Sequence, residues 1–142
     1  MALAMQCRDG VSNHVLLVED DRALRALLAS LLRIEGFVVH ETPSLVGARL
    51  ELREGVMDLA VVDVNLPGAS GLELAAQLRA ASPDLPIVLV TAFPDGAIRS
   101  AALRLRTFLL GKPFALAELG RLAAASVAVR SLGSSAGRPR SA

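Results

Sequence analysis

Val61-Val62-Asp63-Val64-Asn65-Leu66-Pro67 is the stretch from which the fold of this chain can be worked out. It contains the end of a short apolar run, Leu59-Ala60-Val61-Val62, whose β-branched residues are typical of a strand buried on both faces. The run ends on Asp63, and Pro67-Gly68 then breaks the pattern before a helical periodicity begins. Open α/β sheets present their chemistry at the carboxyl ends of such strands, although Asp is also a common turn residue. The stretch therefore predicts a buried parallel strand, with Asp63 as a candidate functional residue.

The composition predicts one globular domain. The chain has 142 residues, of which 53% are hydrophobic and 20% are charged. A formal net charge of +1 gives no argument for a nucleic-acid or membrane surface. The single cysteine, Cys7, excludes an internal disulfide bond and fits a reducing compartment. No apolar run approaches the ~20 residues that span a bilayer, and residues 1–5 lack the basic region of a secretory signal, so we expect a cytoplasmic protein.

Strand-like apolar runs alternate with helical patterns five times along the chain. Thr42-Pro43 is interpreted as the N-cap and first residue of the second helix. The alternation predicts a single doubly wound α/β domain over residues 13–130, with a five-stranded parallel sheet and about five flanking helices. Residues 1–12 are expected to form a flexible leader and residues 131–142 a flexible tail. The predicted strands are 15–18, 37–40, 59–62, 87–90 and 108–110, and the predicted helices are 22–35, 43–54, 72–81, 97–105 and 116–130.

Polar residues gather where the predicted strands end. Right-handed crossovers place the carboxyl ends of all parallel strands on one edge of the sheet, so we expect these residues to meet there. Three acids follow the first strand, and an acid, a hydroxyl and an ammonium follow the third, fourth and fifth strands. In chain order these residues are Glu19, Asp20, Asp21, Asp63, Thr91 and Lys112.

This collection of residues has the chemistry of a phosphoryl-transfer site. Carboxylate and carbonyl oxygens suit a hard divalent cation such as Mg²⁺. Three carboxylates and one ammonium, those of Glu19, Asp20, Asp63 and Lys112, leave an excess of two negative charges that such a cation would neutralise. Asp can act as a nucleophile toward phosphorus, while Lys112 and the Thr91 hydroxyl can stabilise the charge on a phosphoryl group. Each residue alone has an ordinary structural explanation, such as a helix cap or a turn, and only their joint occurrence favours a site.

Four segments together resemble the receiver domain of two-component response regulators. The resemblance covers roughly residues 13–130, and its segments occur in the family's order and spacing. It implies a flavodoxin-like, chemotaxis-regulator-like sheet with strand order 2-1-3-4-5. The segments are Leu16-Leu17-Val18-Glu19-Asp20-Asp21, Val61 to Gly71, Val90-Thr91-Ala92 and Lys112-Pro113-Phe114.

The resemblance also implies a role for each site residue. Asp63 would be the phospho-acceptor, Thr91 the switch hydroxyl and Lys112 the phosphate-pairing lysine. The Mg²⁺ ion would be bound by Asp20 directly, by Glu19 through water, by Asp63, and by the backbone carbonyl of Asn65. Asp21 falls where the family varies, and we interpret it as favouring the following helix N-terminus. The Lys112-Pro113 bond is expected to be cis.

One position departs from the family pattern. Receivers commonly place an aromatic residue three positions before the lysine, where this chain has Leu109. Phe108 is one residue earlier and should face the other side of the sheet by strand alternation. Either Leu109 replaces the aromatic residue, or a local irregularity brings Phe108 into its place. We also expect the Phe93 ring to lie over the phosphoryl group and slow its hydrolysis.

The resulting prediction is a Mg²⁺-dependent phospho-acceptor domain that receives its phosphoryl group from a histidine kinase or a histidine phosphotransfer protein. A downstream effector or output domain would recognise the face formed by the last two helices and the fifth strand, which is also the face expected for a homodimer. Self-phosphotransfer and slow autodephosphorylation would be its only reactions, so it is not an enzyme in the usual sense. No effector domain follows residue 130, so we expect either a single-domain regulator or one excised from a longer chain.

Two alternatives stay open. An aspartyl-phosphate phosphatase of the haloacid dehalogenase type carries Asp-x-Asp after its first strand, whereas this chain has Asp63-Val64-Asn65 after its third. A non-phosphorylated interaction module would lack an acid, the hydroxyl or the lysine, and none of these is missing. Nucleotide binding is disfavoured because no glycine-rich phosphate loop is present. Arg138 and Arg140 are too few to argue for DNA binding by the tail.

Overall fold

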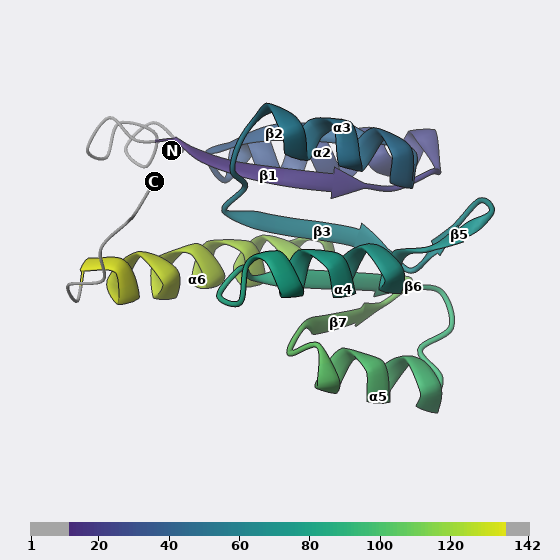
Figure 1. Ribbon diagram of the computed structural model, residues 1–142. Helices are drawn as coiled ribbons and strands as arrows, with labels where there is room; N and C mark the ends of the chain where they lie inside the picture. The colour runs from purple at the N-terminus through teal and green to yellow at the C-terminus, as the bar shows by residue number, and fades with distance from the viewer. Residues whose placement is uncertain (1–11, 136–142) are drawn as a thin grey trace.

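The computed structural model describes residues 12–135 and has one main sheet of five parallel strands. The spatial order is β2-β1-β3-β6-β7, which is 2-1-3-4-5 when these five strands are counted along the chain. The predicted doubly wound fold is therefore confirmed (Figure 1). The strands are β1 (Asn13–Val18), β2 (Phe37–Thr42), β3 (Leu59–Asp63), β6 (Ile87–Thr91) and β7 (Phe108–Gly111).

Helices cover both faces of the sheet, as Figure 1 shows. One face packs against α3 (Leu45–Glu54), α4 (Gly71–Ala81) and α5 (Gly96–Arg104). The opposite face packs against α2 (Arg22–Ile34) and α6 (Leu116–Ser135).

The alternation of side chains along each strand divides the core into two layers. On β1, Leu16 and Val18 join the layer under α3, α4 and α5, while Val15 and Leu17 join the layer under α2 and α6. All four side chains are fully buried. Burying one such side chain is worth about 1.5–3 kcal/mol, so the central strands hold the sheet edge that carries the polar residues in place.

A small two-stranded sheet follows β3, where the sequence indicated only a break. It consists of β4 (Asn65–Leu66) and β5 (Ala69–Ser70), joined through Pro67 and Gly68. Gly68 has a φ of 68°, which a turn with proline before glycine requires and which other residues rarely adopt. The turn returns the chain toward the end of β3, so that α4 begins directly beside Asp63.

Two predicted boundaries are wrong. Thr42 is the last residue of β2, and Ser44 is the N-cap of α3, with its hydroxyl accepting from the Gly47 N–H at 3.0 Å. The longer strand pairing with β1 extends to Thr42 and competes with helix initiation at that residue. Helix α6 continues to Ser135, so residues 131–135 of the expected tail are helical.

The remainder of the tail and all but Ser12 of the expected leader, including Cys7, lie outside the described residues. Among residues 12–135, none of the helices combines the length and the apolar character needed to cross a membrane.

Candidate functional site

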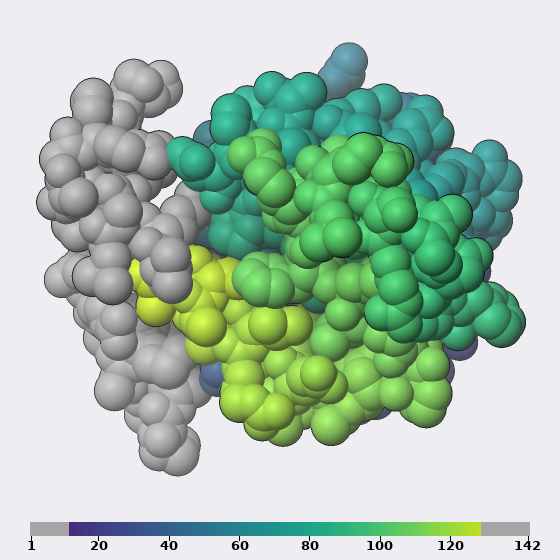
Figure 2. Space-filling view, turned by 90° about the horizontal axis from the view of Figure 1, so that it is seen from below, coloured from purple at the N-terminus to yellow at the C-terminus, as the bar shows by residue number. Residues whose placement is uncertain are grey.

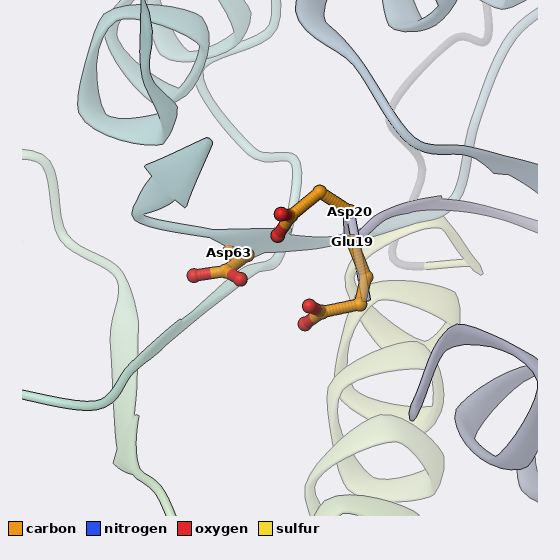
Figure 3. Close-up of side chains that lie close together, drawn as sticks. All are labelled: Glu19, Asp20 and Asp63. Atoms are coloured by element: carbon orange, nitrogen blue, oxygen red, sulfur yellow. The ribbon is translucent and has the colours of Figure 1, made fainter. Parts of the chain in front are cut away.

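Three carboxylates converge at the carboxyl edge of the sheet. Glu19 and Asp20 follow β1, and Asp63 is the last residue of β3. Each offers an oxygen, and these oxygens lie within 4.8 Å of one another. Figure 3 shows the three side chains pointing toward a common region from two neighbouring strands. Glu19 and Asp63 are buried, with exposed fractions of 1% and 3%, whereas Asp20 is exposed.

Backbone hydrogen bonds place this acidic cluster. The Glu19 N–H extends the β1–β2 pairing by donating to the Thr42 carbonyl at 3.1 Å. Asp21 has the capping role expected for it, because its Oδ1 accepts from the Leu24 N–H at 2.9 Å. The Asp21 N–H also donates to Glu19 Oε2 at 3.1 Å and so orients that carboxylate.

Lys112 brings a positive charge into the same region from the loop after β7. Its Nζ lies 3.1 Å from Asp63 Oδ2 and 3.3 Å from Glu19 Oε1. The Lys112 N–H donates to the Thr91 carbonyl at 2.7 Å, and the Lys112-Pro113 peptide bond is cis, as expected. Lys112 therefore contacts two of the three acids.

Burial and charge perturb the ionisation of two groups here. Burial raises the pKa of Glu19 to about 7, and the nearby charge of Asp63 adds to this effect, while the Asp21 N–H and Lys112 oppose it. Burial alone would lower the pKa of Lys112, but its hydrogen bond to Asp63 and the charges of Glu19 and Asp63 raise the pKa overall. The shift at Glu19 thus comes mainly from burial, whereas the shift at Lys112 comes from the two carboxylates beside it.

Thr91 ends β6 in a fully buried position beside the acidic cluster. Its hydroxyl donates to Asn65 Oδ1 at 3.1 Å and accepts from the Phe93 N–H at 3.2 Å. The Asn65 N–H in turn donates to Asp63 Oδ1 at 2.9 Å. Asn65 thus links Asp63 to Thr91, with its backbone N–H bonded to Asp63 and its side-chain oxygen bonded to Thr91. Sequence reasoning missed the side-chain bond between Asn65 and Thr91, because it joins residues from separate elements.

The position three residues before Lys112, where receivers commonly have an aromatic residue, is filled by Leu109. The pairing of β7 with β6 runs without a bulge, matching Val88 with Phe108 and Leu89 with Leu109. Leu109 packs against the same core layer as Leu89, on the face to which Thr91 belongs, while Phe108 is 45% exposed. Leu109 therefore replaces the aromatic residue, and Phe108 does not enter its place.

Phe93 does not have the expected position over Asp63. Its side chain is 74% exposed, although its backbone N–H binds the Thr91 hydroxyl. A ring packed over a buried carboxylate would itself lose most of its exposure. In this conformation Phe93 belongs to the surface of the molecule.

His14 and His40 have partners that the sequence did not indicate. His14 Nδ1 lies 2.9 Å from His40 Nε2, and His40 Nδ1 lies 3.2 Å from Glu51 Oε1. The parallel register pairs His40 with Leu16, which makes the two histidines diagonal neighbours on one face. Such a contact is visible only once the register of β1 and β2 is known.

The acidic cluster fits a Mg²⁺ ion. Mg²⁺ binds in proteins through one or two carboxylates plus waters and prefers oxygen ligands. The cluster offers three convergent carboxylates, two of them buried, and no nitrogen or sulfur ligand belongs to it within the described residues.

Solved structures establish the fold class. A CheY-like receiver domain protein from Methanospirillum hungatei matches 87% of this chain and 99% of its own with a TM-score of 0.81, at 19% identity. The response regulator TrrA from Thermotoga maritima, solved in complex with Mg(2+)-BeF, matches 80% of this chain and 98% of its own with a TM-score of 0.70, at 28% identity. The molecule thus has the CheY-like flavodoxin fold.

Sequence comparison then gives the family. The model of the response regulator receiver domain matches residues 15–124. Over 110 residues the chain is 38% identical to the response regulator MprA of Mycobacterium ulcerans, which covers 77% of this chain and 47% of that protein. It is 33% identical to the C4-dicarboxylate transport transcriptional regulatory protein DctD of Rhizobium meliloti over 74% of this chain and 23% of that protein. The chain belongs to the response regulator receiver domain family of two-component systems, and it spans about half or less of the length of these relatives.

Proposed function

We propose that this receiver domain accepts a phosphoryl group on Asp63 in a Mg²⁺-dependent reaction. The observation that carries the proposal is the convergence of Asp63 with Glu19, Asp20 and Lys112 at one sheet edge. The phosphoryl donor is a histidine kinase or a histidine phosphotransfer protein, and the domain works in the cytoplasm. It is a self-modifying signalling domain and not an enzyme acting on a separate substrate.

The reaction follows from the groups that surround Asp63. A carboxylate oxygen of Asp63 attacks phosphorus, the P–N bond of the phosphohistidine breaks, and the departing imidazole nitrogen takes up a proton. Glu19, Asp20, Asp63 and the backbone carbonyl of Asn65 would hold Mg²⁺, which when bound neutralises charge on the phosphoryl oxygens. Lys112 leaves its contact with Asp63 Oδ2 and pairs with the transferred group.

The conformational response begins at Thr91. In the present conformation its hydroxyl is occupied by Asn65 Oδ1 and the Phe93 N–H. A phosphoryl oxygen on Asp63 is a stronger acceptor than an amide oxygen, so the hydroxyl turns toward it and releases both partners. Because Phe93 leads into α5, the change reaches the segment between β6 and β7. Phosphorylation acts by shifting the population between the two arrangements.

The surface that reads this change lies on α5, β7 and the loop before α5. Phe93, Leu103 and Phe108 are 74%, 79% and 45% exposed there. Figure 2 looks onto this side of the molecule, where α5 and the beginning of α6 are both at the surface. We assign this face to an effector or output domain, and a second copy of the chain can use the same apolar residues for a homodimer.

Intact-mass measurement after incubation with acetyl phosphate tests the proposal. The wild-type chain should gain one hydroxylamine-labile phosphoryl group with Mg²⁺ and none when the metal is chelated. Asp63→Asn should gain none, while Asp21→Asn, a neighbouring carboxylate whose capping role Asn can keep, should be labelled normally. An unlabelled wild type would favour the interaction module, and continuous release of phosphate from small phosphomonoesters would favour the phosphatase.

A further inference from the structure

We propose that Arg25 is a positioning residue for the Mg²⁺ site, an inference that rests on the proposed function of the acidic cluster. Arg25 lies in the first turn of α2, and its backbone N–H donates to the Asp21 carbonyl at 2.8 Å. Its Nη1 donates to the backbone carbonyl of Glu19 at 2.8 Å. This hydrogen bond holds the peptide that joins the two acids of the β1 end.

The Glu19 carbonyl needs a partner from outside the sheet. The β1 ladder ends at Val18, and only the N–H of Glu19 continues the pairing, through Thr42. Glu19 is 1% exposed, so an unpaired carbonyl here would be costly. The guanidinium of Arg25 supplies the missing donor from α2, the helix that begins directly after Asp21. It thereby sets the direction in which the Glu19 and Asp20 side chains leave the backbone.

The charge of Arg25 is balanced away from the acidic cluster. Its Nε lies 3.5 Å from Glu41 Oε1 on β2, and its side chain is 18% exposed. Arg33 contacts the other oxygen of Glu41 at 3.1 Å, and its side chain is 52% exposed. Arg25 and Arg33 therefore share the Glu41 carboxylate, and Arg25 in addition donates to the backbone carbonyl of Glu19.

Two explanations of the role of Arg25, through its charge or through its hydrogen bond to Glu19, predict opposite effects of its removal on Mg²⁺ affinity. If Arg25 acted through its charge, removing a cation near a cation site would tighten the binding of Mg²⁺. If it acts by holding the Glu19 peptide, its removal loosens the two acids and weakens binding. Outer partners that orient metal ligands typically change affinity by about tenfold or more. The sign of the change in affinity therefore separates the two explanations.

Titration calorimetry with Mg²⁺ on the full chain is the test. Arg25→Met, which keeps the apolar stem, should weaken binding by about tenfold. Arg25→Lys, which keeps the charge and one donor, should recover part of the loss. Arg33→Met removes the other partner of Glu41 and should leave the affinity unchanged. Unchanged or tighter binding in Arg25→Met overturns the proposal, and if that variant does not fold, the same outcome in Arg25→Gln, whose shorter side chain cannot reach the Glu19 carbonyl in the same way, does so.

A second measurement needs no metal. The Asp21 N–H that donates to Glu19 Oε2 should exchange with solvent faster in Arg25→Met than in Arg33→Met, in the presence of chelator. Equal exchange in the two variants would contradict the positioning role. A wild-type chain that binds no Mg²⁺ refutes the proposed metal-dependent function itself, whereas a wild type that binds it together with an unaffected Arg25→Met refutes only the role of Arg25.

Discussion

At the scale of single residues, the site contains two buried carboxylates, those of Glu19 and Asp63, and both are paired with Lys112. Glu19 is almost completely buried, yet it lies beside Asp63 and has Lys112 as its cationic neighbour. A buried carboxylate stays ionised only if partners offset its lost hydration. Lys112 is shared between two acids, so it offsets only part of this cost. Without a further cation, part of the cost of burying these carboxylates lowers the free energy of unfolding, and a bound cation would offset it.

The ionisation of Glu19 gives a pH prediction for the metal-free protein. Its pKa is about 7 in the folded chain against an ordinary value of 4.5, so the folded state binds the proton more tightly. The contribution of Glu19 to the free energy of unfolding is therefore greatest at acid pH and falls as the pH rises from about 4.5 to about 7. Each pKa unit corresponds to about 1.4 kcal/mol.

Urea unfolding with chelator, from pH 5 to pH 8, measures this effect. The wild type should lose stability relative to Glu19→Gln as the pH rises, because glutamine does not titrate. A difference between the two proteins that does not change with pH would show that Glu19 keeps its ordinary ionisation in the fold.

At the scale of elements, the join between β3 and α4 holds Asp63. The Gly71 N–H donates to the Val64 carbonyl at 2.8 Å, which brings the start of α4 against the end of β3. A Cβ at Gly71 would collide with the Asp63 carbonyl and the Val62 side chain. The absence of a side chain at Gly71 is therefore what permits this approach.

Gly71→Ala should lower the free energy of unfolding by about 1–3 kcal/mol, as overpacking usually does. It should also slow the labelling of Asp63 by acetyl phosphate, because the displaced backbone carries Asp63, the proposed phospho-acceptor. Gly96→Ala is the matched control, since it is also the first residue of a helix and a Cβ there meets nothing within 4 Å. Equal effects of the two substitutions would mean that the contact at Gly71 does not position Asp63.

At the scale of the whole molecule, one buried guanidinium joins segments that are distant in the chain. Arg79 near the end of α4 is 9% exposed and donates to the carbonyls of Leu105 and Arg106 beyond α5, at 2.8 and 3.0 Å. It also donates to the Leu85 carbonyl before β6, at 2.6 Å. Burial lowers the pKa of Arg79, and the charge of Arg106 adds to this. Its remaining partners are the carbonyls of Ser82 and Pro83.

Arg79→Met should lower the free energy of unfolding by more than about 2 kcal/mol, since hydrogen bonds to charged groups are each worth about 1.5–3 kcal/mol. Labelling of Asp63 should continue, because these contacts involve the loop before β6 and the segment after α5, away from the carboxyl ends of β1 and β3. Arg49→Met is the control, because the Arg49 side chain on α3 is 45% exposed, and this variant should stay within about 0.5 kcal/mol of the wild type in urea unfolding. A loss of labelling without a loss of stability would contradict this structural role.

The sequence by itself determined the fold class and the composition of the site. Runs such as Leu59 to Val62 bury both faces, and local periodicity suffices to order strands and helices along the chain. The acids, Thr91 and Lys112 follow strand ends, so parallel topology alone predicts that they share an edge. The resemblance to receivers added the strand order and the residue roles.

Only the tertiary structure decided how these residues are held. Leu109 faces Thr91's side of the sheet because the β6–β7 ladder has no bulge, which no local pattern could establish. The bonds from Thr91 to Asn65 and from Arg79 to Leu105 span 26 residues each. Arg25 acts on Glu19 only because α2 folds back along β1. Such contacts depend on register and packing between elements, whereas periodicity reports only which face of one element is buried.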